Sequence, residues 1–152
     1  LVFEFSPVLE NGHREFIISA DGIKSSFPSV RNLVSSAPII DKWEIVPFRQ
    51  PKKSINQLTY NGLTIMVNDI FFKYRRNNGK IDLELHIKDF YESAEWTAAS
   101  FVLLDNIIGE FHSEMSVGFI DKKELNEIDR NELFPIAILP QIIEEYQSEL
   151  NN

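Results

Sequence analysis

The segment 80–90, KIDLELHIKDF, constrains the fold more strongly than any other stretch of the chain. Polar and charged side chains alternate in it with the apolar residues Ile81, Leu83, Leu85 and Ile87. Successive side chains of a strand point to opposite faces, so this pattern predicts a strand with one apolar face and one polar face. The turn-forming NNG sequence at 77–79 predicts a hairpin with the strand before it. Such a sheet is typical of antiparallel pairing, and helices must cover its apolar face.

A strongly apolar helix is predicted over residues 93–108, SAEWTAASFVLLDNII. Ser93 is a suitable N-cap, and apolar residues cover most of the helix circumference, so this helix should be the most buried one. Gly109 is predicted to end it, because glycine is favoured just after a helix C-terminus. Residues 110–120, EFHSEMSVGFI, are then predicted to form a strand whose core side carries Phe111, Met115, Val117 and Phe119.

The remaining chain supplies further strands and two more helices. Strands are predicted at 1–5, 14–20 and 42–48, a meander at 58–88, and helices at 27–37 and 139–150, with a polar connector at 121–132. A helix between the strands at 14–20 and 42–48 predicts that these two strands are parallel neighbours. We therefore expect an α+β fold: a mixed, mainly antiparallel sheet of about five to seven strands with two or three helices packed on one face. With 152 residues, 1–152 should form a single globular domain.

Composition excludes several classes of function. The chain has no cysteine, which rules out disulfides, thiolate zinc sites and cysteine nucleophiles and favours a reducing cytoplasm. Its net charge of −8 opposes binding to phosphate polymers and anionic membranes, so we expect neither nucleic acid nor a membrane as a partner. No apolar run approaches the roughly 18 residues of a membrane span. The six glycines do not cluster into a phosphate-binding loop, and we expect no cofactor.

One group of side chains resembles a metal or acid/base site. Glu110, His112 and Glu114 are spaced i, i+2, i+4 and would share one face of the strand predicted there. If that strand lay beside the one at 80–88, His86 would join them, giving two nitrogen and two oxygen ligands suited to Zn²⁺ or another divalent metal. Glu110 or Glu114 would then act as the base of a hydrolytic site. The alternative, and the commoner case, is a solvated face of a half-exposed strand.

Asp105 is a second candidate catalytic residue, beside Glu110. It interrupts the apolar helix near its C-terminal end, where the helix dipole disfavours negative charge. A buried acid there must be paired or hydrogen-bonded, and a raised pKa would permit acid/base chemistry. The structural alternative is that Asp105 lies on a narrow polar strip of the helix or bonds a backbone amide.

Two basic groups could bind an anionic ligand or an acidic partner. One comprises Arg49, Lys52 and Lys53, and the other surrounds the predicted hairpin tip with Lys73, Arg75, Arg76 and Lys80. Charged hairpin tips also serve solubility, which is the alternative interpretation. Phe71 and Phe72 must lie on opposite faces of their strand, so one ring needs cover from a helix or from a partner chain. This predicts a homodimer as one arrangement.

Four segments together resemble a family of small bacterial proteins of unknown function. They are FEF…REFIISADGIKSSFPSV, WEIVPFR, KIDLELHIKDF and LLDNIIGEF…VGFID, and the resemblance covers most of the chain. It implies a bacterial, cytoplasmic protein of one domain and implies no activity.

Three functions remain open from the sequence. The favoured one is a non-enzymatic binding or regulatory module of the bacterial cytoplasm that binds itself or another protein. The first alternative is a small metal-dependent hydrolase that uses His86, Glu110, His112 and Glu114. The second alternative is an acidic inhibitor or immunity-type protein that neutralises a basic partner.

Overall fold

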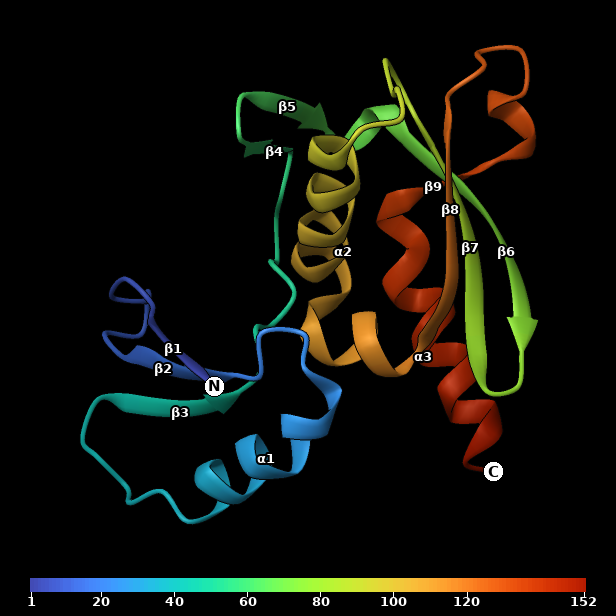
Figure 1. The fold of residues 1–152 in the computed structure, drawn as a ribbon. Helices are drawn as coiled ribbons and strands as arrows, with labels where there is room; N and C mark the ends of the chain where they lie inside the picture. Colours follow the sequence, from blue (N-terminus) through green and yellow to red (C-terminus); the bar gives the residue numbers. More distant parts are fainter.

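The computed structural model describes residues 1–152 and divides the strands among three sheets (Figure 1). The N-terminal sheet has the order β1-β2-β3 and contains β1 (Val2–Phe5), β2 (Arg14–Ser19) and β3 (Trp43–Pro47). A separate hairpin contains β4 (Gln57–Tyr60) and β5 (Leu63–Met66). The C-terminal sheet has the order β8-β7-β6-β9 and contains β6 (Ile70–Asn77), β7 (Lys80–Ile87), β8 (Val117–Glu124) and β9 (Phe134–Pro135). The α+β class is confirmed, with three sheets in place of one.

The C-terminal sheet contains the segment whose alternation dominates the sequence. β6 and β7 form the predicted antiparallel hairpin, while β8 runs parallel to β7. Helices α2 (Ala94–Met115) and α3 (Leu139–Leu150) lie on the same side of this sheet (Figure 1). The main hydrophobic core fills the space between the helices and the sheet and includes the four apolar residues of β7, namely Ile81, Leu83, Leu85 and Ile87. The prediction of one buried face is therefore confirmed.

The N-terminal sheet is built around the predicted strand-helix-strand unit. β2 pairs antiparallel with β1 and parallel with β3, and α1 (Phe27–Ser35) lies in the connection between β2 and β3. Helix α1 covers part of one face of the sheet and forms a second, small core with Ile18, Ala20, Phe27, Val30 and Phe48. Each side of the molecule thus has its own apolar core, and α2 extends from one to the other (Figure 1).

The prediction of a strand at 110–120 is wrong for its first seven residues, 110–116. Gly109 interrupts the helix with φ 79° and ψ 157°, but the chain then resumes a helical path as far as Met115, and β8 begins at Val117. The loop after β3 replaces the helical hydrogen bonds at this kink. The Arg49 carbonyl accepts from the Glu110 N–H at 2.9 Å, and the Lys52 N–H donates to the Asn106 carbonyl at 2.8 Å. Gly109 is therefore a kink at which another segment docks.

Phe71 and Phe72 lie on opposite faces of β6, and this chain covers both rings. Phe72 is in the main core. Phe71 packs with Leu125 and Leu133, and the guanidinium carbon of Arg130 lies 4.7 Å from its ring centre. The segment after β8 therefore covers the Phe71 ring, so this ring needs no partner chain. The predicted connector at 121–132 contributes its first four residues to β8.

Substitution of Gly109 by alanine should destabilise the fold strongly. Its φ/ψ values lie in a region populated almost only by glycine, and an added Cβ would lie 2.9 Å from Pro51 Cδ and 3.1 Å from the Arg49 carbonyl oxygen. We expect Gly109→Ala to lower the free energy of unfolding by about 2–4 kcal/mol, measured by urea denaturation. Gly12→Ala is the matched control, because Gly12 also has positive φ but open space around it; it should cost about 1 kcal/mol. Equal losses in the two variants would contradict the docking role of Gly109.

Candidate functional site

The most deeply buried charged side chain of the protein is Glu110, with 0% of its surface exposed. Its Oε1 accepts hydrogen bonds from the backbone N–H groups of Ala20 at 2.9 Å and Gly22 at 3.3 Å. Its Oε2 accepts from the Arg49 N–H at 3.1 Å. A buried carboxylate is tolerated only with such bonds. Ala20 and Gly22 follow β2, and Arg49 follows β3. Glu110 therefore holds the C-terminal ends of both strands against α2.

The side chain of Arg49 adds ion pairs nearer the surface to this contact between the N-terminal sheet and α2. Its guanidinium donates to the carboxylate of Glu4 on β1 and, at 3.0 Å, to Oδ1 of Asp21. Partial burial lowers the pKa of Arg49, but its hydrogen bonds to Glu4 and Asp21 outweigh this effect and raise it. We call these four residues, Glu4, Asp21, Arg49 and Glu110, the Glu110–Arg49 cluster. Every charged member is hydrogen-bonded within the protein, so the cluster has a structural role.

The predicted metal ligands do not converge. Residues 110–115 are helical, so Glu110 and Glu114 share a face one turn apart while His112 projects elsewhere. The Nδ1 atom of His112 lies 2.7 Å from the Ser116 hydroxyl oxygen, and burial lowers the pKa of His112. No group of three or more histidine, aspartate or glutamate side chains has the geometry to hold a metal ion.

His86 belongs to a different set of contacts, on β7. Its neighbour on β8 is Lys123, and its Nε2 lies 2.8 Å from Oε1 of Glu84. Lys123 donates to the other oxygen of Glu84 at 2.7 Å. The hydrogen bond from Lys123 and the one involving His86 lower the pKa of Glu84. His86 therefore contacts Glu84 and neighbours Lys123, in place of the predicted meeting with His112.

Two carboxyl groups on α2 flank Glu110 in sequence and have raised pKa values. Burial raises the pKa of Asp105, and the nearby Glu110 carboxylate adds to the effect. Burial also raises the pKa of Glu114, to which the negative charge of Asp105 contributes. The predicted perturbation of Asp105 is thus present, and desolvation is its main cause.

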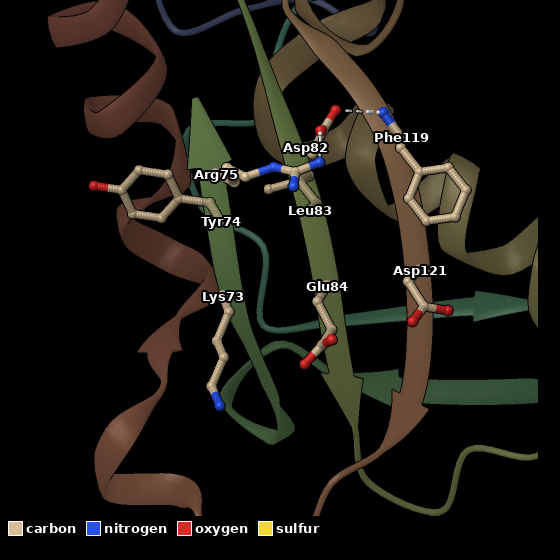
Figure 2. A pocket seen from close by; sticks show the side chains of 8 residues that line it. All are labelled: Lys73, Tyr74, Arg75, Asp82, Leu83, Glu84, Phe119 and Asp121. Carbon is tan, nitrogen blue, oxygen red and sulfur yellow. Dashed lines mark hydrogen bonds and ion pairs between the residues drawn. The ribbon is translucent and has the colours of Figure 1, made fainter. Parts of the chain in front are cut away.

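The open face of the C-terminal sheet forms a shallow hollow of about 290 Å³ (Figure 2). Figure 2 shows the Asp82 carboxylate reaching from β7 toward the backbone of β8, where it accepts from the Phe119 N–H at 2.9 Å. Arg75 and Asn77 each donate to the other Asp82 oxygen at 3.0 Å. The Phe119 bond first, and then the Asn77 and Arg75 bonds, lower the pKa of Asp82. Asp82 thereby stabilises the register shift between β7 and β8, so this hollow is a structural feature.

The two predicted basic groups do not form one clamp: the first lies in the loop after β3, and the second lies on β6 and β7. Arg49 is already paired with Glu4 and Asp21. Of the second group, Arg75 pairs with Asp82 and Arg76 pairs with Glu149. Lys80 Nζ donates to the carbonyl oxygens of Glu114 and Val117 at 3.1 Å each. Most of the predicted cationic side chains therefore stabilise this chain.

The largest cavity is a groove of about 950 Å³ between the β1–β2 side of the molecule and α2. Lys52 and Lys53 line it, but so do Glu10, Glu15 and Asp105, together with the Glu4 and Arg49 members of the cluster. Its walls carry both signs of charge, so the groove favours neither an anion nor a cation.

An apolar surface on the N-terminal sheet is the feature that the sequence interpretation missed. A hollow of about 170 Å³ is lined only by Phe5, Phe16, Ile40, Trp43 and Ile45. Phe3 lies beside it on β1 and is 53% exposed, while Phe5 is 62% exposed. We call these six residues, Phe3, Phe5, Phe16, Ile40, Trp43 and Ile45, the aromatic surface. The alternation of phenylalanines in LVFEF was the available signal, but it identifies a shared face only once the β1–β2 and β2–β3 registers are known.

The rings of the aromatic surface are held in place by one another. Phe5 stacks on Phe16 with ring centres 5.1 Å apart and meets Trp43 edge-on at 5.6 Å. Phe3 lies 5.5 Å from Phe16. The Arg14 guanidinium carbon lies 5.1 Å from the Trp43 ring centre, at the border of the surface. The surface is therefore an ordered apolar centre beside a charged side chain.

A scan against protein-family models finds no match, and searches of the curated proteins and of the solved structures find no significantly similar chain. None of the helices combines the length and the apolarity needed to cross a membrane.

Because the pKa of Asp105 is raised, replacing its carboxyl group should change the free energy of unfolding by an amount that depends on pH. The folded state holds the Asp105 proton more tightly than the unfolded state, so this group's contribution to stability falls as pH rises through the raised pKa. Asp105→Asn should therefore stabilise the protein, relative to wild type, more at neutral pH than below the ordinary aspartate pKa of about 3.9. Urea unfolding at both pH values measures this, with the exposed Asp41→Asn as control. A difference between Asp105→Asn and wild type that does not change with pH would contradict the assignment.

Proposed function

We propose that this chain is a non-enzymatic protein-binding module that contacts its partner through the aromatic surface. The observation that carries the proposal is the wholly apolar hollow on the N-terminal sheet, beside which two phenylalanines are more than half exposed. Contiguous exposed apolar surface is costly in water, and on folded proteins it marks interaction sites. A bacterial, cytoplasmic setting belongs to the same proposal.

The geometry of the surface suits protein recognition. Its rings already pack against one another, so little side-chain freedom would be lost when a partner covers them. Aromatic side chains in ordered clusters dominate the energetics of protein interfaces. Arg14, which lies against the Trp43 ring, provides a charged side chain at the rim of the surface, as such an interface needs. This arrangement requires no reacting group.

An acidic inhibitor remains a second candidate because the charge is unevenly distributed. Residues 57–152 contain 17 acidic and 8 basic side chains, whereas residues 1–56 contain 6 acidic and 7 basic ones. The negative potential is therefore concentrated on the C-terminal part, which would attract a basic partner with strong salt dependence. The hydrolase alternative loses its basis, because it required His86, Glu110, His112 and Glu114 to converge.

Site-specific photo-crosslinking in cells of the source organism tests the proposed function. A photoreactive phenylalanine analogue at Phe5 should yield a discrete protein adduct, identified by mass spectrometry, because the partner covers this side chain. The same analogue at Phe119 is the matched control: this residue is 69% exposed but lies on the C-terminal sheet. The absence of an adduct at Phe5, or the same adducts at both positions, would contradict the proposal.

A further inference from the structure

We propose that the partner of the aromatic surface is a second copy of this chain, and that the two copies join β1 to β1 about a twofold axis. The two N-terminal sheets would then form one continuous six-stranded sheet. This inference rests on the proposed function, since it uses the same surface, and it adds the identity of the partner and the register of contact.

The first observation is a free strand edge. β1 pairs with β2 on one side only, and no other strand lies on its other side. The Ser6 N–H donates to the Glu15 carbonyl at 3.0 Å, which continues the β1–β2 register. Hydrogen-bonded pairs alternate along an antiparallel ladder, so Val2 and Glu4 direct their main-chain groups toward β2. Phe3 and Phe5 direct theirs toward the free edge, where they are available to another strand.

The second argument is geometric, since the residue alternation of β1 would allow it to pair with a second β1. With the twofold axis at Phe3, this residue lies opposite Phe3 of the second copy, and each Phe3 N–H donates to the other Phe3 carbonyl. Leu1 then lies opposite Phe5 of the second copy. Residues 1, 3 and 5 share the face of β1 that carries the aromatic surface, so the apolar faces of both copies become continuous. A one-residue shift would place these side chains on opposite faces.

The third observation is the charge near the contact. The net charge of −8 opposes self-association in general, but residues 57–152 carry it, while residues 1–56 have nearly balanced charges. Glu4 is the only charged residue of β1, and it pairs with Arg49 on the face away from the aromatic surface. Two copies that meet at β1 therefore bring no unpaired like charges together.

The size of the contact predicts a reversible dimer. Leu1, Phe3 and Phe5 are 49%, 53% and 62% exposed. Together these three side chains present roughly 350 Å² of apolar surface per copy, to which the strand backbone and Val8 add. A standard interface buries about 800 Å² per partner, so this contact is small. We therefore expect dissociation on dilution and a dimer held jointly by apolar burial and main-chain hydrogen bonds.

Sedimentation velocity over a concentration series tests the inference, with a charge-swap pair as the decisive variants. Phe3→Glu and Phe3→Lys each place like charges opposite one another across the twofold axis, so each should remain monomeric where wild type dimerises. An equal mixture of the two should dimerise again, because opposite charges then face each other. Phe119→Glu, which changes an exposed phenylalanine of the C-terminal sheet, should dimerise like wild type.

A second variant covers the case in which the charged variants do not fold. The chain has no cysteine, so Phe3→Cys introduces a single thiol for a short bismaleimide linker. Phe3→Cys should give a covalent dimer with this linker, and Phe119→Cys should not. A monomeric wild type at every concentration, or dimers in the separate charged variants, would overturn the inference.

The tests of partner identity and of function can fail separately. If wild type is monomeric but the Phe5 analogue still crosslinks to a different protein, the self-association is wrong and the proposed function stands. If neither dimer nor adduct forms, both are wrong.

Discussion

The buried carboxylate of Glu110 is the interaction on which the arrangement of the whole molecule depends. It accepts hydrogen bonds from three backbone N–H groups, which belong to two separate loops, one after β2 and one after β3. The cost of desolvating this charge is offset only while all three donors are present, so the N-terminal sheet has one stable position on α2. Gly109 makes the contact sterically feasible, because a side chain there would collide with the loop that contains Arg49 and Pro51. The two apolar cores are thereby joined by a polar contact.

This attachment also determines which surfaces remain for function. The face of the N-terminal sheet that carries Glu4, Glu15 and Ile17 lines the groove beside α2, while α1 covers only part of the opposite face. The uncovered part is the aromatic surface, and the free edge of β1 borders it. On the C-terminal sheet, by contrast, the outer face is occupied by ion pairs of its own around Asp82 and Glu84. The proposed interface therefore lies on the N-terminal sheet, where apolar surface and unpaired backbone occur together.

Local patterns predicted the elements better than their long-range contacts. The alternation in 80–90 identified β7 and its buried face, and the apolar segment 93–108 identified most of α2, because both signals depend on neighbouring residues. The i, i+2, i+4 spacing of Glu110, His112 and Glu114 suggested a strand face, yet the decisive partners of Glu110 are Ala20, Gly22 and Arg49, which are 61 to 90 residues away. Gly109 was correctly identified as a break, but a glycine with positive φ can end a helix or kink it. Likewise, the aromatic surface depends on strand registers that the sequence does not display.

Amide hydrogen exchange in Glu110→Gln tests the central role of this carboxylate most directly. Glutamine keeps the shape of the side chain but presents an NH₂ group to one of the donors, which loses its hydrogen bond. The account predicts that the amides of Ala20, Gly22 and Arg49 lose on the order of tenfold protection or more, beyond any change at Leu85 in the C-terminal sheet. Glu124→Gln, at the exposed end of β8, should leave all of these amides unchanged. Unchanged protection at the three amides in Glu110→Gln, or a loss no greater than that at Leu85, would contradict the claim that Glu110 holds the N-terminal sheet on α2.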